Sequence, residues 1–171
     1  MYQSRPLHSG AKGTQFSFSA APALLRAAPS ADIFRGEGAG GRPTAGRKYD
    51  RCAVVGNSAN LLHYRNGANV DAHDMVIRLN DAPTMGFEEF VGSKTTFRLV
   101  TVDKAWFQET DEVVIMQMQS KAGLLVYKEL REKDGARRLF AFDTDFSAYV
   151  SHNVPTMPSV DMFGVFLALQ R

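Results

Sequence analysis

Short apolar runs alternate with amphipathic or polar stretches from Tyr49 onward, and this pattern predicts an α/β fold. The runs rich in β-branched and aromatic residues are typical of strands. They cover Arg51–Gly56, Met75–Asn80, Thr95–Thr101, Val113–Met118 and Leu139–Phe142. Helices are predicted between them, at Ala59–Arg65, Asp103–Thr110, Ala122–Lys133, Phe146–Val150 and Ser159–Gln170. Strands that alternate with helices favour a mostly parallel sheet in a three-layer sandwich.

The last predicted helix, Ser159–Gln170, is apolar nearly all round. A helix of this kind needs burial on several sides. The sequence ends at Arg171 and offers no further segment to cover it. We therefore expect the domain at residues 48–171 to be C-terminally incomplete.

Residues 1–47 form a different region, rich in Ala, Gly, Ser, Pro and Arg and without a sustained period. Such a segment buries too little apolar surface to offset the entropy of ordering, so we predict a disordered or targeting leader. Gly36–Gly41 matches GxGxxG, but no strand precedes it and Arg42-Pro43 follows, which excludes a dinucleotide site. No apolar run reaches the length of a membrane helix, about 18–20 residues.

Composition excludes few functions. The chain of 171 residues is long enough for one domain with a core. Its net charge of +2 gives no reason to expect nucleic acid or another polyanion as a partner. Residues 1–50 hold 7 Lys+Arg and 3 Asp+Glu, so the basic character belongs to the leader. The single cysteine, Cys52, excludes a disulfide within the chain.

The clearest candidate for chemistry is the stretch from Gly56 to Asn60, where a strand ends and a helix begins. Gly56 allows close approach of a ligand, and the free N–H groups of a first helical turn suit an anion. Asn57 and Asn60 add neutral donors. A P-loop lysine is absent, which argues against ATP or GTP. An ordinary strand–turn–helix capped by Ser58 explains the same residues, and the spacing alone leaves both interpretations open.

The order of motifs around this turn resembles the long sialyl motif of the eukaryotic sialyltransferases, glycosyltransferase family 29. The matching segments are Cys52–Ser58, Asp71–Asp74, Val76–Asn80, Asp81–Pro83, Gly86–Glu89 and Val91–Thr96. Pro158–Leu169 is similar to the opening of the family's short sialyl motif. Ser159 matches that motif, whereas Val160 and Asp161 depart from it. An acid at that helix start would repel an anionic donor and weaken its binding.

The resemblance implies a Rossmann-like GT-A-variant fold and inverting transfer of sialic acid from CMP-sialic acid to a glycan acceptor. It implies donor binding by Gly56, Asn57, Ser58, Asn60, Asn80 and Ser159, without a metal or other cofactor. It also implies a Golgi protein with an N-terminal membrane anchor, although no anchor is legible in this sequence. The family's second cysteine, the partner of Cys52, has no counterpart here.

The resemblance further implies a histidine as the general base, in a later motif that this sequence lacks. His8, His63, His73 and His152 do not stand at the matching place. The catalytic residue is therefore unknown, and we expect the 171-residue chain to be inactive or nearly so.

Two alternatives stay open. The first is a non-catalytic module that binds CMP or a related nucleotide. The second is a metal-dependent nucleotide-sugar transferase, in which Asp143 and Asp145 hold Mn²⁺ or Mg²⁺ on a diphosphate. Two structural expectations accompany them. Asp74 is the expected partner of Arg78. Trp106 with Phe107 could pack an acceptor sugar, but we expect them to anchor their helix on the sheet.

Overall fold

The computed structural model describes residues 34–35, 49–118, 120–133, 138–142 and 144–169, and these residues form a mixed α/β fold. The sheet has the order β1-β6-β5-β4-β3-β2, in which β2 to β6 are parallel and β1 pairs antiparallel with β6. Its strands are β1 (Phe34–Arg35), β2 (Cys52–Val55), β3 (Met75–Leu79), β4 (Phe97–Val100), β5 (Val113–Met116) and β6 (Leu139–Phe142). The predicted parallel sheet and its five strands are confirmed.

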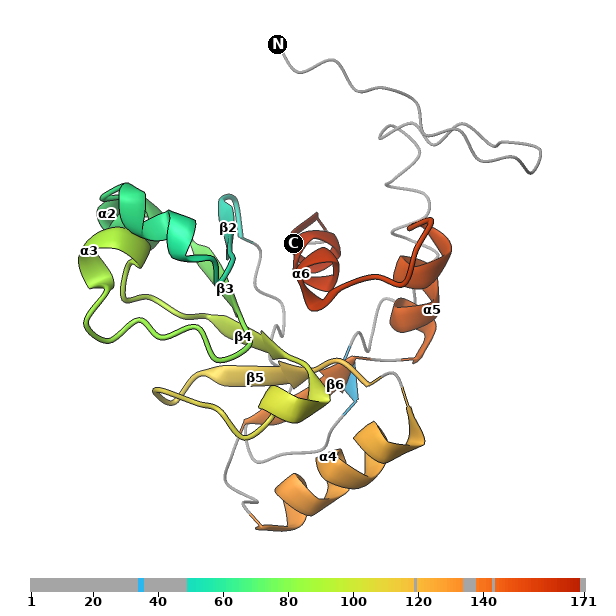
Figure 1. Cartoon of the computed structure of the whole chain (residues 1–171). Helices are drawn as coiled ribbons and strands as arrows, with labels where there is room; N and C mark the ends of the chain where they lie inside the picture. Colours follow the sequence, from blue (N-terminus) through green and yellow to red (C-terminus); the bar gives the residue numbers. More distant parts are fainter. Residues whose placement is uncertain (1–33, 36–48, 119, 134–137, 143, 170–171) are drawn as a thin grey trace, which may run out of the picture.

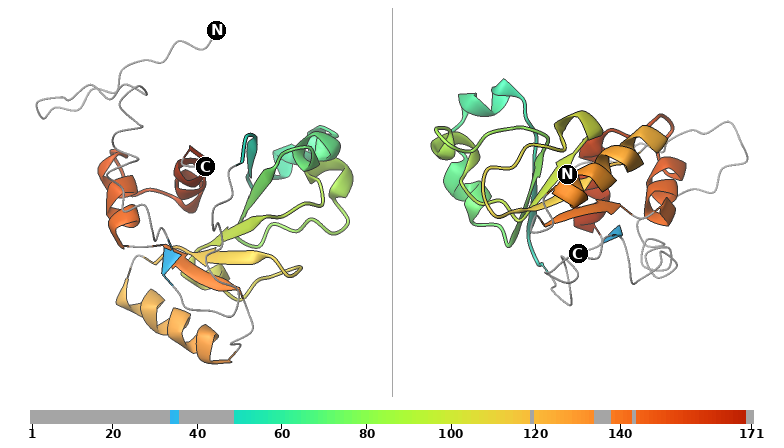
Figure 2. Two further views of the ribbon diagram at one scale, coloured as in Figure 1. Left: turned by 180° about the vertical axis from the view of Figure 1, so that it is seen from behind. Right: turned by 90° about the horizontal axis from the view of Figure 1, so that it is seen from below.

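Helices cover both faces of this sheet. α4 (Lys121–Lys133) lies on one face, while α5 (Thr144–His152) and α6 (Val160–Leu169) lie on the other (Figures 1 and 2). Short helices occupy the connections near β2 to β4: η2 (Ala59–His63), α2 (Gly67–Asp71), α3 (Glu88–Val91) and η3 (Val102–Lys104). The predicted three-layer arrangement is therefore present. Within the described part of the chain, no helix is long and apolar enough to cross a membrane.

The core lies mainly between the sheet and α6. Alternate residues of β3 to β6 face this layer and pack with Phe163 and Leu167 of α6. A Cβ atom on Gly164 would lie 3.2 Å from Val54 Cγ1 and 3.3 Å from Leu99 Cδ1. The missing side chain therefore lets α6 approach β2 and β4 closely. A smaller cluster on the opposite face packs under Val126 and Leu130 of α4.

Two predicted helices differ from the structure, and three observed elements were not predicted. The helix expected at Ala59–Arg65 is a 3₁₀ helix, η2. Of the helix expected at Asp103–Thr110, only a short 3₁₀ helix at Val102–Lys104 is present. Neither α2 nor α3 was predicted, because helices of four or five residues are too short to show an apolar period. β1 falls within the predicted leader at 1–47; the rest of that leader lies outside the described residues.

The connection into β4 is held by the carboxylate of Asp71, at the end of α2. This carboxylate accepts hydrogen bonds from the N–H groups of Ser93 and Lys94, at 2.8–3.0 Å, and from the Ser93 hydroxyl at 2.9 Å. Burial by itself would raise the pKa of Asp71, but these donors and the charge of Arg78 outweigh it and hold the pKa below its ordinary value. Asp71 therefore stabilises the fold in its ionised form.

This pKa gives the stability of the protein a defined dependence on pH. Because the folded state binds the Asp71 proton more weakly than the unfolded state, its contribution is present above the unfolded pKa, about 3.9, and is lost as the pH falls through the folded pKa. Asp71→Asn should lower the free energy of unfolding at pH 7 by about 1–3 kcal/mol and should lessen its dependence on pH below about 5. Urea titrations from pH 3 to 7 measure both; parallel profiles for the two proteins would contradict the assignment.

Candidate site at the carboxyl edge of the sheet

Two asparagines end neighbouring parallel strands. Cys52 to Val55 of β2 pair with Met75 to Arg78 of β3 at a constant offset of 23 residues. Continued past the strand ends, this offset sets Asn57 level with Asn80, since 57 + 23 = 80. Adjacent strands lie about 4.8 Å apart, so the two asparagines follow their strands side by side at the carboxyl edge. In open α/β sheets this edge is where ligands bind.

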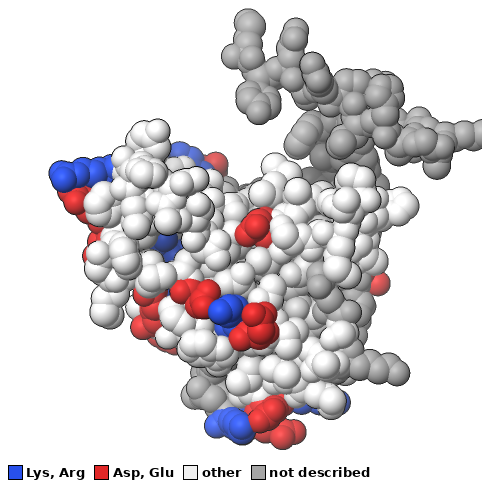
Figure 3. All heavy atoms as spheres, viewed as in Figure 1, with Lys and Arg blue, Asp and Glu red and all other residues white. Residues whose placement is uncertain are grey.

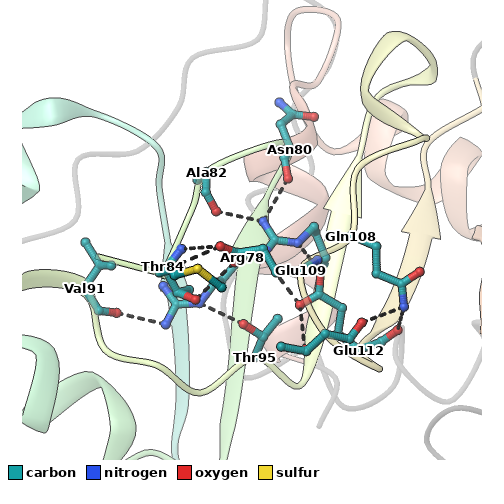
Figure 4. A network of polar contacts seen from close by, with 12 residues as sticks. Arg78, Asn80, Ala82, Thr84, Val91, Thr95, Gln108, Glu109 and Glu112 are labelled. Atoms are coloured by element: carbon teal, nitrogen blue, oxygen red, sulfur yellow. Dashed lines mark hydrogen bonds and ion pairs between the residues drawn. The ribbon is translucent and has the colours of Figure 1, made fainter. Parts of the chain in front are cut away.

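The side chain of Asn80 has a fixed orientation. Its Oδ1 accepts a hydrogen bond from the Thr101 N–H at 3.0 Å. The Thr101 hydroxyl lies 3.1 Å from the same oxygen, but its single proton has a closer acceptor in Asp103 Oδ1, at 2.6 Å. A main-chain N–H can only donate, so the oxygen of the amide must face Thr101 and the NH₂ group must face away. The Asn80 backbone is in the left-handed region, with φ of 52°. Figure 4 shows its side chain pointing away from the buried polar network, while its main-chain carbonyl faces that network.

The turn after β2 presents further donors. Ser58 is the N-cap of η2, and its hydroxyl accepts a hydrogen bond of 3.3 Å from the Asn60 N–H. Asn57 and Asn60 are exposed, and their side chains make no hydrogen bond among the described residues. A Cβ atom on Gly56 would meet nothing within 4 Å, so the space beside Gly56 is open. The capping role of Ser58 is thus real, and it leaves the two amides available to a ligand.

Charged groups next to Asn80 include the Lys104–Asp81 ion pair and the carboxylate of Asp103, which accepts from the Thr101 hydroxyl at 2.6 Å. Lys104 Nζ lies 2.7 Å from a carboxylate oxygen of Asp81, the residue after Asn80. The hydrogen bond and charge of Lys104 hold the pKa of Asp81 below its ordinary value. Figure 3 shows mostly uncharged side chains on the face in view, with acidic and basic groups mixed near its centre. An anion at the Asn80 turn would therefore depend on neutral donors rather than on a basic patch.

The start of α6 reaches the same edge at β5. Gln117, the residue after β5, is buried and donates from Nε2 to the Pro158 carbonyl at 3.2 Å. Ser159 follows, exposed, with its hydroxyl 3.4 Å from a carboxylate oxygen of Asp161. The acidic group that was expected to weaken donor binding therefore stands next to Ser159. A hollow of ≈ 230 Å³ lies beside this turn, lined by Met118, Ser147, Ala148, Ser151, Met157, Pro158 and Phe163.

The structure thus places all six predicted donor-binding residues at the carboxyl edge of the sheet. Gly56, Asn57, Ser58 and Asn60 follow β2, Asn80 follows β3, and Ser159 stands by the end of β5. Their role in binding stays a prediction. The sequence analysis missed Thr101, which orients Asn80, and Gln117, which holds the start of α6. Both residues lie at the end of a predicted strand. This position is the only signal that the sequence carries for them.

The sequence analysis also missed a buried ionic cluster. Arg98 Nε lies 2.5 Å from Glu112 Oε1, and Arg98 Nη2 lies 2.8 Å from Glu109 Oε2. Arg98 and Glu112 are almost fully buried. The signal was an arginine within an otherwise apolar strand, because a buried charge needs a partner.

The expected partner of Arg78 is wrong, and the expected aromatic anchor is wrong for Trp106. Arg78 does not pair with Asp74; it donates to the carbonyls of Val91 and Lys94 and to the Thr95 hydroxyl. Backbone carbonyls accept hydrogen bonds from a guanidinium, and residue types alone did not show these partners. Trp106 does not anchor a helix on the sheet, since it is 65% exposed. The neighbouring Phe107 packs instead, with its ring 4.8 Å from the Arg98 guanidinium.

The histidines and carboxylates that were considered for catalysis or metal binding follow different elements of the fold. His73 precedes β3, so it lies at the opposite end of that strand from Asn80, and its Nδ1 is 2.9 Å from the Asn69 carbonyl. Asp143, a candidate metal ligand, lies outside the described residues, and Asp145 is exposed. Among the residues that the structure describes, no group of three His, Cys, Asp or Glu could hold a metal ion.

Comparison with known proteins agrees with this architecture. A model of the family described as Glycosyltransferase family 29 (sialyltransferase) matches residues 13–134. The mouse CMP-N-acetylneuraminate-beta-galactosamide-alpha-2,3-sialyltransferase 1 is 53% identical over 66 residues, which cover 39% of this chain and 19% of that protein. Sialyltransferase-like protein 2 of Arabidopsis thaliana is 41% identical over 80 residues, or 47% of this chain and 18% of that protein. The match therefore spans about a fifth of these curated relatives.

The fold has a counterpart among solved structures. A mammalian sialyltransferase in complex with Gal-beta-1-3GalNAc-ortho-nitrophenol superposes with a TM-score of 0.64 at 28% sequence identity. The superposition covers 70% of this chain and 51% of that one. The predicted sialyltransferase-like fold is thereby confirmed. The family match extends over most of the sequence, and the chain belongs to glycosyltransferase family 29, the sialyltransferases.

Proposed function

We propose that this chain binds CMP-sialic acid at the carboxyl edge of β2 and β3 and contributes this donor site to inverting transfer of sialic acid to a glycan. The observation that carries the proposal is the oriented amide of Asn80. Because the Thr101 N–H holds its oxygen, the NH₂ group is left as a neutral donor at the end of β3, and the Gly56–Asn60 turn follows the neighbouring strand β2. Neutral donors suit the single phosphate of CMP, which carries less charge than a di- or triphosphate.

In this reaction an acceptor hydroxyl attacks C2 of the sialic acid while CMP leaves. Negative charge then builds on the phosphate oxygen of the leaving group. Amide donors that are already in place stabilise that charge without reorganising during the step. The amides of Asn57 and Asn80 and the N–H groups at the start of η2 would serve this purpose. A glycan with terminal galactose is the first acceptor to test, because Gal-beta-1-3GalNAc is the acceptor part of the ligand in the similar mammalian structure.

We further propose that a polypeptide of these 171 residues binds the nucleotide but does not transfer sialic acid at a significant rate. The family resemblance implies a histidine base, and His63, His73 and His152 do not match its position. Without a base, the proton of the attacking hydroxyl has no acceptor, which typically costs about 10²–10⁴ in rate. A Golgi location belongs to the same proposal and rests on the resemblance alone.

Calorimetric titration with CMP, CDP and UDP, with and without Mn²⁺, tests the donor site. We expect CMP to bind without metal and more tightly than UDP. Incubation with CMP-sialic acid and Gal-beta-1-3GalNAc tests turnover, for which we expect no product. Rapid transfer would show that the chain contains a base. Binding that requires Mn²⁺ and a diphosphate would favour the alternative that uses Asp143 and Asp145.

Gly56→Ala tests where the nucleotide lies. The added methyl group would meet no protein atom within 4 Å, so it would enter the open space beside the turn. We expect the free energy of unfolding to stay the same or rise by about 0.4–1 kcal/mol, while CMP affinity falls about tenfold. Thermal unfolding without ligand is the control. Unchanged affinity would place the nucleotide away from this turn.

A further inference from the structure

Arg98 fixes the turn that carries Asn80. The residue lies on β4, next to β3, and its Nη1 donates to the carbonyls of Asn80 at 3.0 Å and Ala82 at 2.9 Å. These two carbonyls belong to the turn that begins at Asn80 in the left-handed region. Figure 4 shows both carbonyls directed toward the buried network. A single planar guanidinium therefore holds the main chain on each side of the turn.

Two glutamates hold Arg98 in turn. Glu112, which lies just before β5, accepts a hydrogen bond from Arg98 Nε and a longer one, of 3.5 Å, from Nη2. Glu109 accepts a hydrogen bond of 2.8 Å from Arg98 Nη2. It also accepts from the N–H of Thr84 at 2.8 Å and from the Thr84 hydroxyl at 3.1 Å. The cluster thus connects the turn after β3, the middle of β4 and the segment before β5. The two glutamates thus hold Nε and Nη2 of Arg98, and Nη1 donates to the carbonyls of the turn.

We propose that Arg98, held by Glu112 and Glu109, is the positioning residue for the side-chain amide of Asn80. The proposal rests on the donor role assigned to Asn80 under the proposed function. Arg98 is fully buried and does not reach the ligand. It acts on the backbone of Asn80, and thereby sets where the NH₂ group of that side chain points.

A purely structural role for the cluster makes a different prediction, and the protein offers a matched control. Arg78 is the neighbour of Arg98 across β3 and β4, and it is 2% exposed. Its guanidinium also donates to backbone carbonyls, those of Val91 and Lys94, and makes no contact with Asn80. A substitution at Arg78 therefore disturbs an equally buried guanidinium without releasing the Asn80 turn.

The experiment compares Glu112→Gln with Arg78→Lys in the full chain, at a temperature where both stay folded. Hydrogen exchange by NMR reports on the Thr101 amide, which donates to Asn80 Oδ1. The Gln117 amide, which donates to the Val100 carbonyl, is the reference for the sheet next to it. In Glu112→Gln we expect exchange at Thr101 to accelerate about tenfold relative to Gln117, and CMP affinity to fall about tenfold. In Arg78→Lys we expect no change in Thr101 exchange relative to Gln117 and no change in CMP affinity.

The outcomes separate the two proposals. If the unaltered protein binds no CMP, the proposed function fails, and the Thr101 exchange still decides whether the cluster positions Asn80. If Glu112→Gln leaves Thr101 protected, or changes it no more than Arg78→Lys does, the positioning role is overturned. Should Glu112→Gln not fold, Thr84→Val removes only the hydroxyl contact with Glu109. It should then shift Thr101 exchange in the same direction by a smaller factor, and no shift would overturn the role.

Discussion

Among substitutions of the described glycines by alanine, Gly67→Ala should cause the largest loss in the free energy of unfolding. Gly67 is the first residue of α2 and is buried against the start of α3. A Cβ atom there would lie 1.9 Å from the Glu88 carbonyl oxygen and 2.8 Å from that of Glu89. These atoms belong to the backbone of α3, so they cannot move away without displacing the helix. We expect the free energy of unfolding to fall by about 3 kcal/mol or more.

Urea denaturation of Gly67→Ala and Gly56→Ala side by side measures this effect against a matched control. Both substitutions add one methyl group within the region between β2 and β3. Gly56 has open space around it, so only Gly67→Ala should lose stability. Equal midpoints for the two variants would show that α2 and α3 are not packed as the structure has them.

Asn80→Asp should cause the largest loss of nucleotide binding. Aspartate keeps an oxygen acceptor for the Thr101 N–H, so the turn should be preserved. It replaces the NH₂ donor by a second, negatively charged oxygen, which would face the phosphate of CMP. Loss of a hydrogen bond to a charged group costs about 1.5–3 kcal/mol, so affinity should fall about 10- to 100-fold.

Asn80→Gly is the companion variant. Glycine tolerates the φ of 52° but lacks the whole side chain, so it removes the donor without adding a charge. Calorimetry should place its CMP affinity between those of the unaltered protein and Asn80→Asp. Full binding by Asn80→Asp would remove Asn80 from the site. Equal losses for both variants would show that the added charge contributes nothing and that loss of the donor alone weakens binding.

Much of the fold could be predicted from local sequence. The strands at β2 to β6 are short runs of β-branched and aromatic residues, and α4 has one apolar face that packs on the sheet. These patterns depend on neighbouring residues only, so they are legible without coordinates. The helices α2 and α3 were not, because four or five residues do not complete a period. Their position depends on Gly67 and Asp71, which contact residues about 20 positions later in the chain.

The candidate site could likewise be predicted only where it depends on neighbouring residues in the sequence. The turn residues Gly56 to Asn60 stood out because they come where an apolar strand ends. The family resemblance then gave them a ligand and added Asn80 and Ser159. The mistaken partner of Arg78 shows the limit of this reasoning. Asp74 is close in sequence and has the right charge, yet the guanidinium turns toward carbonyls at Val91 and Lys94. A backbone carbonyl has no signature in a sequence, so such a partner could not be predicted.

The sequence by itself determined that the protein is an α/β domain, which residues end its strands, and which family it resembles, because hydrophobic period and motif order are written along the chain. Only the tertiary structure decided that the amide of Asn80 is oriented by Thr101 and that its turn is held by Arg98, Glu109 and Glu112. The physical reason is that a hydrogen bond depends on direction as well as on partner. Direction arises only when strands distant in sequence come into register.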